Sequence, residues 1–223
     1  MNFFGHAALA ASHFSAAAEP PDARELATLC AGAMLPDFIG MLQLSRPVVG
    51  DELLARGVAF HHRTDGVFHD LPSFHRLSRR AFAWLSERQL PRGPARAVAH
   101  IGIEMLLDEV LAQQRPARDA YLSALEVPLA ALLTFPAAAD AERLARLQQA
   151  LRGRSVSERA PAAELVAERI VRTLSSRPRL ATDEAGQLLL GGWVAVTRPL
   201  VEHEAPEVFA MLRERLANFG RAE

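Results

Sequence analysis

Residues 95–113, with the sequence ARAVAHIGIEMLLDEVLAQ, contain the pattern that decides the fold class. Apolar side chains fill almost the whole stretch after a turn signal at residues 91–94, so we expect one largely buried helix. His100, Glu104 and Asp108 interrupt the apolar residues at intervals of four. At about 100° per residue these three side chains drift only about 80° around the helix axis and form one polar stripe.

Helical periodicity dominates the rest of the chain as well, and alternating strand-like runs are scarce. We expect further helices over residues 3–17, 22–34, 51 to an end near 66, 72–87, 117–133, 140–151, 161–175, 184–198 and 206–218. Asp22 can cap the second of these, and Leu35-Pro36-Asp37 is expected to stop it. No internal repeat, low-complexity linker or charge block divides the sequence. The prediction is an all-α protein, a compact multi-helix bundle in a single domain over residues 1–223.

Composition narrows the class of protein. Half of the 223 residues are hydrophobic, which is enough to bury a core without disulfides, and the single Cys30 fits a reducing compartment. The net charge of −1 gives no reason to expect nucleic acid or an anionic membrane as a partner. The apolar N-terminal segment lacks the early Lys or Arg of a signal peptide, and no uninterrupted apolar run reaches roughly 18 residues. We therefore expect a cytoplasmic protein.

Histidines gather in the first half of the chain, where residues 1–100 hold seven of the eight. The densest patch is residues 60–70, FHHRTDGVFHD. Residues four apart share a helix face, so His61 and Asp65 could direct an imidazole and a carboxylate at one ion. The alternative without function is a solvated helix end, because Gly66 follows.

The stripe in residues 95–113 gives the strongest physical argument for a site. Ionised side chains in a buried helix are costly unless they are paired, hydrogen-bonded or bound to a metal. Glu104 and Asp108 are therefore candidates for a metal or catalytic site. The alternative is that they pair with core arginines such as Arg63 or Arg79.

Two further residues complete the candidate set. His6 interrupts an otherwise apolar first helix, and Asp37 follows a Leu-Pro turn. His6 can instead be a hydrogen-bonded core histidine, and Asp37 a turn or helix cap. Their occurrence together with the other candidates, on several helices, favours a shared site. Most of the remaining histidines are expected at the surface or as supporting groups (His62, His69, His75 and His203).

Mixed imidazole and carboxylate ligands suit Mn²⁺, Fe²⁺, Mg²⁺ or Zn²⁺, and the lack of cysteine ligands argues against a structural zinc. Such a metal can lower the pKa of bound water and polarise a phosphoryl oxygen, while a nearby arginine stabilises charge on the phosphoryl group. The sequence contains no Gly-x-Ser-x-Gly elbow, Walker loop or dinucleotide-binding glycine pattern. Metal-assisted hydrolysis is therefore the favoured chemistry.

Several short segments resemble the bacterial acyl carrier protein phosphodiesterases. Met1-Asn2-Phe3-Phe4-Gly5-His6 resembles that family's Asn-Phe-x-x-His start. The matching segments that follow, in the same order, are Leu35-Pro36-Asp37-Phe38, the block Gly57 to Asp65 (Gly-x-x-x-His-x-Arg-x-Asp in the family), Asp70 with Pro72, Glu104 with Asp108, and Ser176-Arg177-Pro178-Arg179-Leu180. The block that contains His61 and Asp65 is the most specific. Glu104 stands where the family has an aspartate, and His100 has no obvious counterpart.

The resemblance implies an all-helical relative of the HD-type phosphohydrolases that uses Mn²⁺ to hydrolyse 4′-phosphopantetheine from holo acyl carrier protein. On this hypothesis Arg63 contacts the phosphate, Glu104 and His100 act as ligands or as general acid and base, and five residues surround the metal: His6, Asp37, His61, Asp65 and Asp108. Two alternatives stay open: hydrolysis of a nucleotide or another small phosphoester at the same site, and a non-catalytic helical binding protein. The oligomeric state is open as well.

Overall fold

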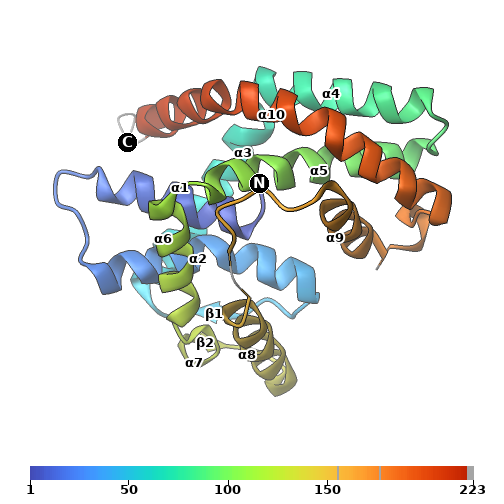
Figure 1. Cartoon of the computed structure of the whole chain (residues 1–223). Helices are drawn as coiled ribbons and strands as arrows, with labels where there is room; N and C mark the ends of the chain where they lie inside the picture. The colour runs from blue at the N-terminus through green and yellow to red at the C-terminus, as the bar shows by residue number, and fades with distance from the viewer. Residues whose placement is uncertain (155, 176, 220–223) are drawn as a thin grey trace. The chain divides into compact units, whose positions relative to one another are not determined.

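The computed structural model describes residues 1–154, 156–175 and 177–219, and it confirms the all-α prediction (Figure 1). The helices are α1 (Phe3–Ser15), α2 (Ala23–Leu42), α3 (Glu52–His69), α4 (Pro72–Glu87), α5 (Arg92–Ala112), α6 (Arg115–Glu126), α7 (Leu129–Leu132), α8 (Ala138–Arg152), α9 (Ala163–Ser175), the 3₁₀ turn η1 (Pro178–Leu180) and α10 (Glu184–Phe219). Strands β1 (Val48–Val49) and β2 (Leu133–Thr134) form a two-residue antiparallel pair. Ser176, which opens the last segment of the family resemblance, lies outside the described residues.

Local sequence signals fix several helix starts. Asp22 caps α2 as predicted: its carboxylate accepts hydrogen bonds from the backbone N–H groups of Arg24 and Glu25, and the Glu25 side chain accepts one from the Asp22 N–H. This reciprocal pair is a capping box. Pro72 occupies the first turn of α4, where its missing N–H leaves no intrahelical bond unmade.

The expected stop at Leu35-Pro36-Asp37 is wrong, because α2 continues through Pro36 to Leu42. The apolar residues on both sides of the proline, Leu35 and Phe38, are buried. Their burial offsets the one hydrogen bond that proline removes from a helix. The helix therefore continues, and Asp37 lies inside it rather than on a turn.

Burial of apolar residues also explains why the predicted boundaries of the C-terminal helices are wrong. Residues 184–198 and 206–218 belong to one helix, α10, which runs through Pro199 and Pro206. Val201 and Ala205, between the two prolines, are buried. Helix α3 likewise continues past Gly66 to His69.

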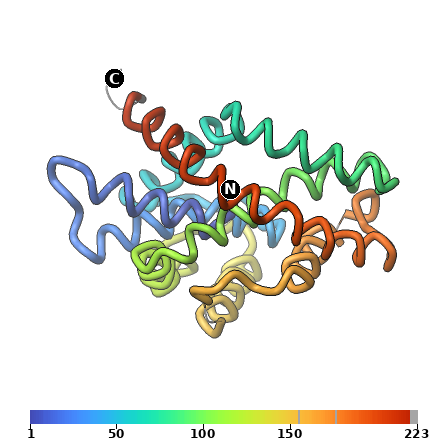
Figure 2. Tube along the Cα trace, turned by 45° about the horizontal axis from the view of Figure 1, so that its top comes forward, coloured from blue at the N-terminus to red at the C-terminus, as the bar shows by residue number. Residues whose placement is uncertain are grey.

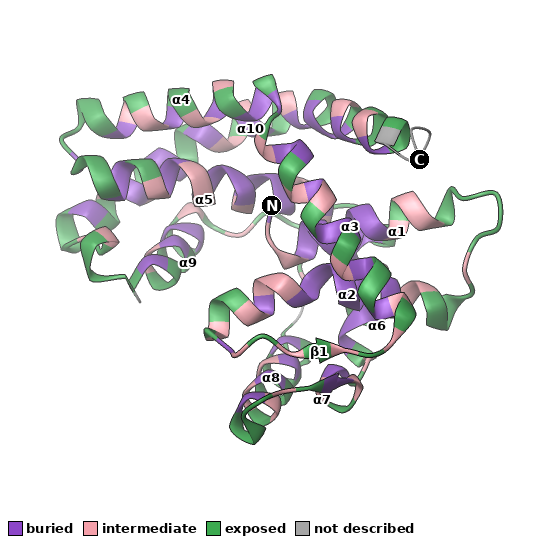
Figure 3. Cartoon of the chain, turned by 180° about the vertical axis from the view of Figure 1, so that it is seen from behind, coloured by how far each residue is buried: buried purple, intermediate pink, exposed green. Residues whose placement is uncertain are grey.

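Contacts within the chain gather in two compact units. Unit A comprises Asn2–Gly66 and Leu111–Glu158, and unit B comprises Met1, Val67–Val110 and Arg159–Glu223. In unit A, α1, α2 and α6 pack against one another, and α8 contacts α6 and α7. In unit B, α10 packs along α4 and α9 (Figures 1 and 2). Helices α4, α6, α9 and α10 each have a buried side and an exposed side, whereas residues 4–10 of α1 and 28–35 of α2 are buried all round (Figure 3).

Helix α2 is the one described helix that is long and apolar enough to cross a membrane. That property is weak evidence, since core helices of soluble proteins share it, and residues 28–35 are buried within unit A.

Candidate metal centre

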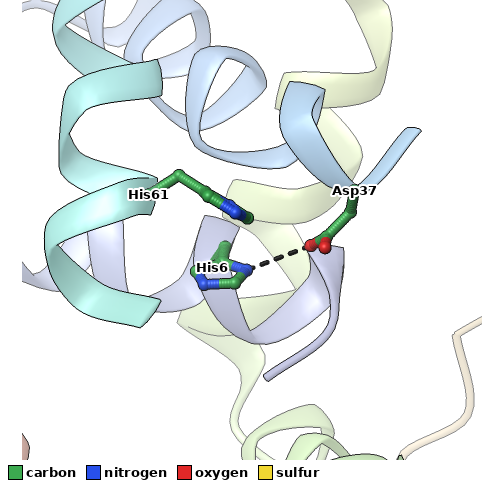
Figure 4. A group of neighbouring side chains, drawn as sticks. All are labelled: His6, Asp37 and His61. Atoms are coloured by element: carbon green, nitrogen blue, oxygen red, sulfur yellow. Dashed lines mark hydrogen bonds and ion pairs between the residues drawn. The ribbon is translucent and has the colours of Figure 1, made fainter. Parts of the chain in front are cut away.

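Three side chains of the ligand type meet in unit A, each from a different helix (Figure 4). His6 lies on α1, Asp37 on α2 and His61 on α3. The Nδ1 atom of His6 is 3.0 Å from Oδ2 of Asp37, and the centroids of the two imidazole rings are 3.9 Å apart. One ligand atom from each residue lies within 4.8 Å of the other two. This spacing allows all three residues to hold a single metal ion.

A close contact between two glycines positions α3 against α2. A Cβ atom on Gly57 would lie 2.2 Å from the carbonyl oxygen of Leu29, and one on Gly32 would lie 2.3 Å from the carbonyl oxygen of Leu54. Any side chain at either position would hold the two backbones apart. Because both positions are glycine, the helices approach closely enough for His61, one turn beyond Gly57, to reach the backbone of α2.

A hydrogen bond to the backbone of α2 fixes the tautomer of His61. Its Nδ1 atom is 2.9 Å from the carbonyl oxygen of Ala33. A carbonyl oxygen only accepts hydrogen bonds, so Nδ1 carries the proton and donates, and Nε2 of the neutral ring keeps its lone pair. Histidines that bind metals are commonly oriented in this way by a backbone carbonyl.

The charge state of His61 also suits a ligand. Burial lowers its pKa to about 4, with a further lowering by His6, although Asp37, the bond to Ala33 and Asp65 act in the opposite direction. The imidazole is therefore neutral near pH 7, as a metal ligand must be.

Asp65 and Arg63 lie on the same helix as His61, and both are half-buried. The carboxylate of Asp65 is near enough to raise the pKa of His61, in line with their spacing of one helical turn. Arg63 lies near His13 of α1, whose pKa is lowered first by burial and then by this guanidinium. The ring of His13 contacts Phe60, with centroids 5.0 Å apart.

A second group lies in unit B. Both His69 Nε2, at the end of α3, and His100 Nε2, on α5, are 3.1 Å from the same oxygen of Glu104. The N-terminal amine of Met1 is 3.3 Å from that oxygen. Burial by itself would raise the pKa of Glu104, but the hydrogen bonds from the two imidazoles and the charge of the amine hold it well below its usual range. The three side chains form a second group with metal-ligand spacing.

The predicted residues thus divide between the units. Those from the first three helices belong to unit A: His6, Asp37, His61, Arg63 and Asp65. His100, Glu104 and Asp108, all on α5, belong to unit B, and Asp108 is buried one turn beyond Glu104. Glu104 pairs with imidazoles and an amine instead of the arginines considered from the sequence, and Arg79 is exposed.

His69 is the residue of these groups that the sequence did not single out as a ligand. With α3 expected to end near Gly66, His69 fell outside the helix. Continued to its true end, the helix places His61, Asp65 and His69 at intervals of four, the spacing that had identified the stripe on α5. His62, His75 and His203 are exposed.

Comparison of the chain with models of known protein families, with curated proteins and with solved structures gave no match.

Proposed function

We propose that this protein is a metal-dependent phosphodiester hydrolase whose metal is held by His6, Asp37 and His61. The observation that carries the proposal is the convergence of these three side chains from three helices in unit A, with ligand atoms within 4.8 Å of one another. Asp65 is the fourth candidate ligand, because it follows His61 by one helical turn. Asp108, predicted as a further ligand, stays a prediction.

The donor set fits a divalent cation. His61 is neutral and held by Ala33 so that Nε2 keeps a lone pair, and Asp37 supplies a carboxylate oxygen beside His6. Two nitrogens with one or two carboxylate oxygens suit Mn²⁺, Fe²⁺ and Zn²⁺ better than Mg²⁺, which prefers oxygen ligands. Mn²⁺ is our first choice, since the family that the sequence resembles uses it.

When bound, the metal would supply Lewis-acid activation of water and of a phosphoryl oxygen. The chain's own side chains would do the rest. Arg63, on the same helix as His61, would bind the phosphate through its forked guanidinium. Asp65 would add its negative charge to the site, where its carboxylate already acts electrostatically on His61.

The substrate that we propose is holo acyl carrier protein, cleaved at the phosphodiester that joins phosphopantetheine to a serine. Support for this substrate comes from the sequence resemblance alone, above all from the block Gly57 to Asp65. The same chemistry would act on any accessible phosphodiester, so the substrate is tested separately from the reaction.

The reaction is tested with the purified full chain, Mn²⁺, and two substrates: holo acyl carrier protein and bis(p-nitrophenyl) phosphate. We expect release of phosphopantetheine, its loss with a chelator, and a fall of at least about 100-fold in His61→Ala, since a metal ligand is lost. His62→Ala is the matched control, because His62 is the exposed neighbour on the same helix.

Each outcome decides one part of the proposal. If the wild-type chain binds Mn²⁺ yet hydrolyses neither substrate with Mn²⁺, Fe²⁺ or Zn²⁺, the hydrolase proposal is wrong and the helical binding protein is favoured. If only the small diester is hydrolysed, the carrier-protein substrate is wrong while the reaction stands. Equal activity of His61→Ala and His62→Ala would remove His61 from the site.

A further inference from the structure

The second group, in unit B, is built from two imidazoles that face one buried carboxylate. His69 and His100 place their Nε2 atoms 3.1 Å from the same oxygen of Glu104. The two rings are nearly parallel, with centroids 4.9 Å apart and an angle of 25°. Glu104 is 7% exposed, so its charge needs partners inside the protein.

Two rigid elements and one aromatic ring hold these ligands. His100 and Glu104 are four residues apart on α5 and therefore share a face of that helix. His69 comes from the last turn of α3. The ring centroid of Phe74 on α4 lies 5.4 Å from the centroid of each imidazole. Packing of this ring against the imidazoles restricts their orientation, which helps to keep the geometry of a metal site.

The two histidines of the site are also partly exposed to solvent. The side chain of His100 is 45% exposed and that of His69 is 33% exposed, whereas the side chain of Glu104 is 9% exposed. This exposure gives an ion a route from water to the imidazoles, and water can complete its coordination. Two histidines and one glutamate with an open position are the ligand set of several catalytic zinc sites.

We propose that His69, His100 and Glu104 form a second divalent-cation site, selective for zinc-type metals over Mg²⁺. The nitrogen-rich donor set gives the selectivity, since imidazole favours Zn²⁺ and its transition-metal neighbours while Mg²⁺ favours oxygen. The proposal assigns His100 and Glu104 as ligands. From the sequence, both residues were candidates either for ligands or for a general acid and base. It does not depend on the hydrolase proposal, because it concerns different side chains.

The test is a Zn²⁺ titration by isothermal calorimetry of full-length variants. His61→Ala removes the unit A group and leaves the second site to be measured. We expect His61→Ala to bind one Zn²⁺, and His61→Ala with His100→Ala to bind it about 100-fold more weakly or not at all. His61→Ala with His203→Ala is the matched control, since His203 is an exposed histidine of unit B, and it should bind like His61→Ala.

A second variant guards against loss of folding. Glu104→Gln keeps the shape of the side chain and removes its charge, so combined with His61→Ala it should keep the helical circular dichroism and lose zinc. The proposal is overturned if His61→Ala binds no Zn²⁺, or if the variants at position 100 or 104 bind it as tightly as His61→Ala. Loss of phosphodiesterase activity in His61→Ala alone would bear on the hydrolase proposal and leave this site in place.

Discussion

Gly57→Ala is the substitution that tests how the centre in unit A is built. The new Cβ would lie 2.2 Å from the Leu29 carbonyl oxygen, 2.8 Å from the Gly32 Cα and 2.9 Å from the Ala33 nitrogen, all of them backbone atoms of α2. Ordinary contact begins at 3.4 Å, so the two helices must separate by about 1.2 Å at this point. Backbone atoms cannot move aside as the tip of a side chain can.

The energetic cost can be separated from helix propensity by a matched control. Gly66→Ala lies on the same helix, and its Cβ would meet nothing within 4 Å. Both substitutions stabilise the helix by about 1 kcal/mol through helix propensity. Only Gly57→Ala is also destabilised by overpacking, typically by about 1–3 kcal/mol. Gly57→Ala should therefore be less stable than Gly66→Ala by about 1–3 kcal/mol in denaturant unfolding.

The same displacement should weaken the site. His61 follows Gly57 by one turn, and its bond of 2.9 Å to the Ala33 carbonyl would be broken by a shift of about 1 Å. Loss of such an orienting bond typically lowers metal affinity about 10–100-fold. We expect this fall in Mn²⁺ titrations of Gly57→Ala against Gly66→Ala. Equal stability and equal affinity of the two variants would refute the argument that the glycine contact positions His61.

Three further predictions concern His61 and Cys30. With Mn²⁺ at 100 times its Kd, the wild type and His62→Ala should gain about 2.7 kcal/mol of stability in denaturant unfolding, and His61→Ala none from that site. Without metal, stability should fall as pH drops from about 6.5 towards 4, because the unfolded chain takes up a proton that native His61, with its pKa of about 4, does not. In unfolding curves measured between these two pH values, His61→Gln should show a smaller dependence of stability on pH. Burial raises the pKa of Cys30 to about 12, so iodoacetamide should label it at the rate of unfolding, and rapid labelling of the native protein would contradict its burial.

The ends of helices were predicted correctly where a local sequence signal acts alone. They were predicted wrongly where burial of apolar residues acts against that signal. Asp22 could be identified as a cap because its bonds reach only three residues along the chain. Helices were expected to end at Pro36 and before Pro199. This expectation considers only the hydrogen bond that proline removes and the steric clash of its ring. Both helices continue because apolar residues around each proline are buried, and that burial depends on partners far away in the sequence.

The candidate ligands could be found from the sequence, but their grouping could not. His6 and Asp37 stand out as ionisable residues in apolar surroundings, and His61 stands out within a patch rich in histidine. Their convergence depends on the crossing of α2 and α3 at Gly32 and Gly57, which are 25 residues apart and carry no signal that they touch. In the same way, His69 joins Glu104 only because α3 continues past the glycine that was expected to end it.

Buried ionisable groups occur both in metal centres and in polar networks of the core, and the two differ in how they respond to metal. Near Asp37 and Glu104 the imidazoles already supply hydrogen bonds, as side chains do in polar networks of a protein core. Such a network is costly to break at one partner, whatever its purpose, and a loss of stability in single variants would therefore not identify it. A metal site differs in one measurable respect: the bound metal stabilises the native state by an amount that rises with the logarithm of the free metal concentration once this exceeds Kd. The dependence of stability on metal, compared between ligand variants and exposed histidine controls, is thus the quantity that separates a functional centre from a satisfied core.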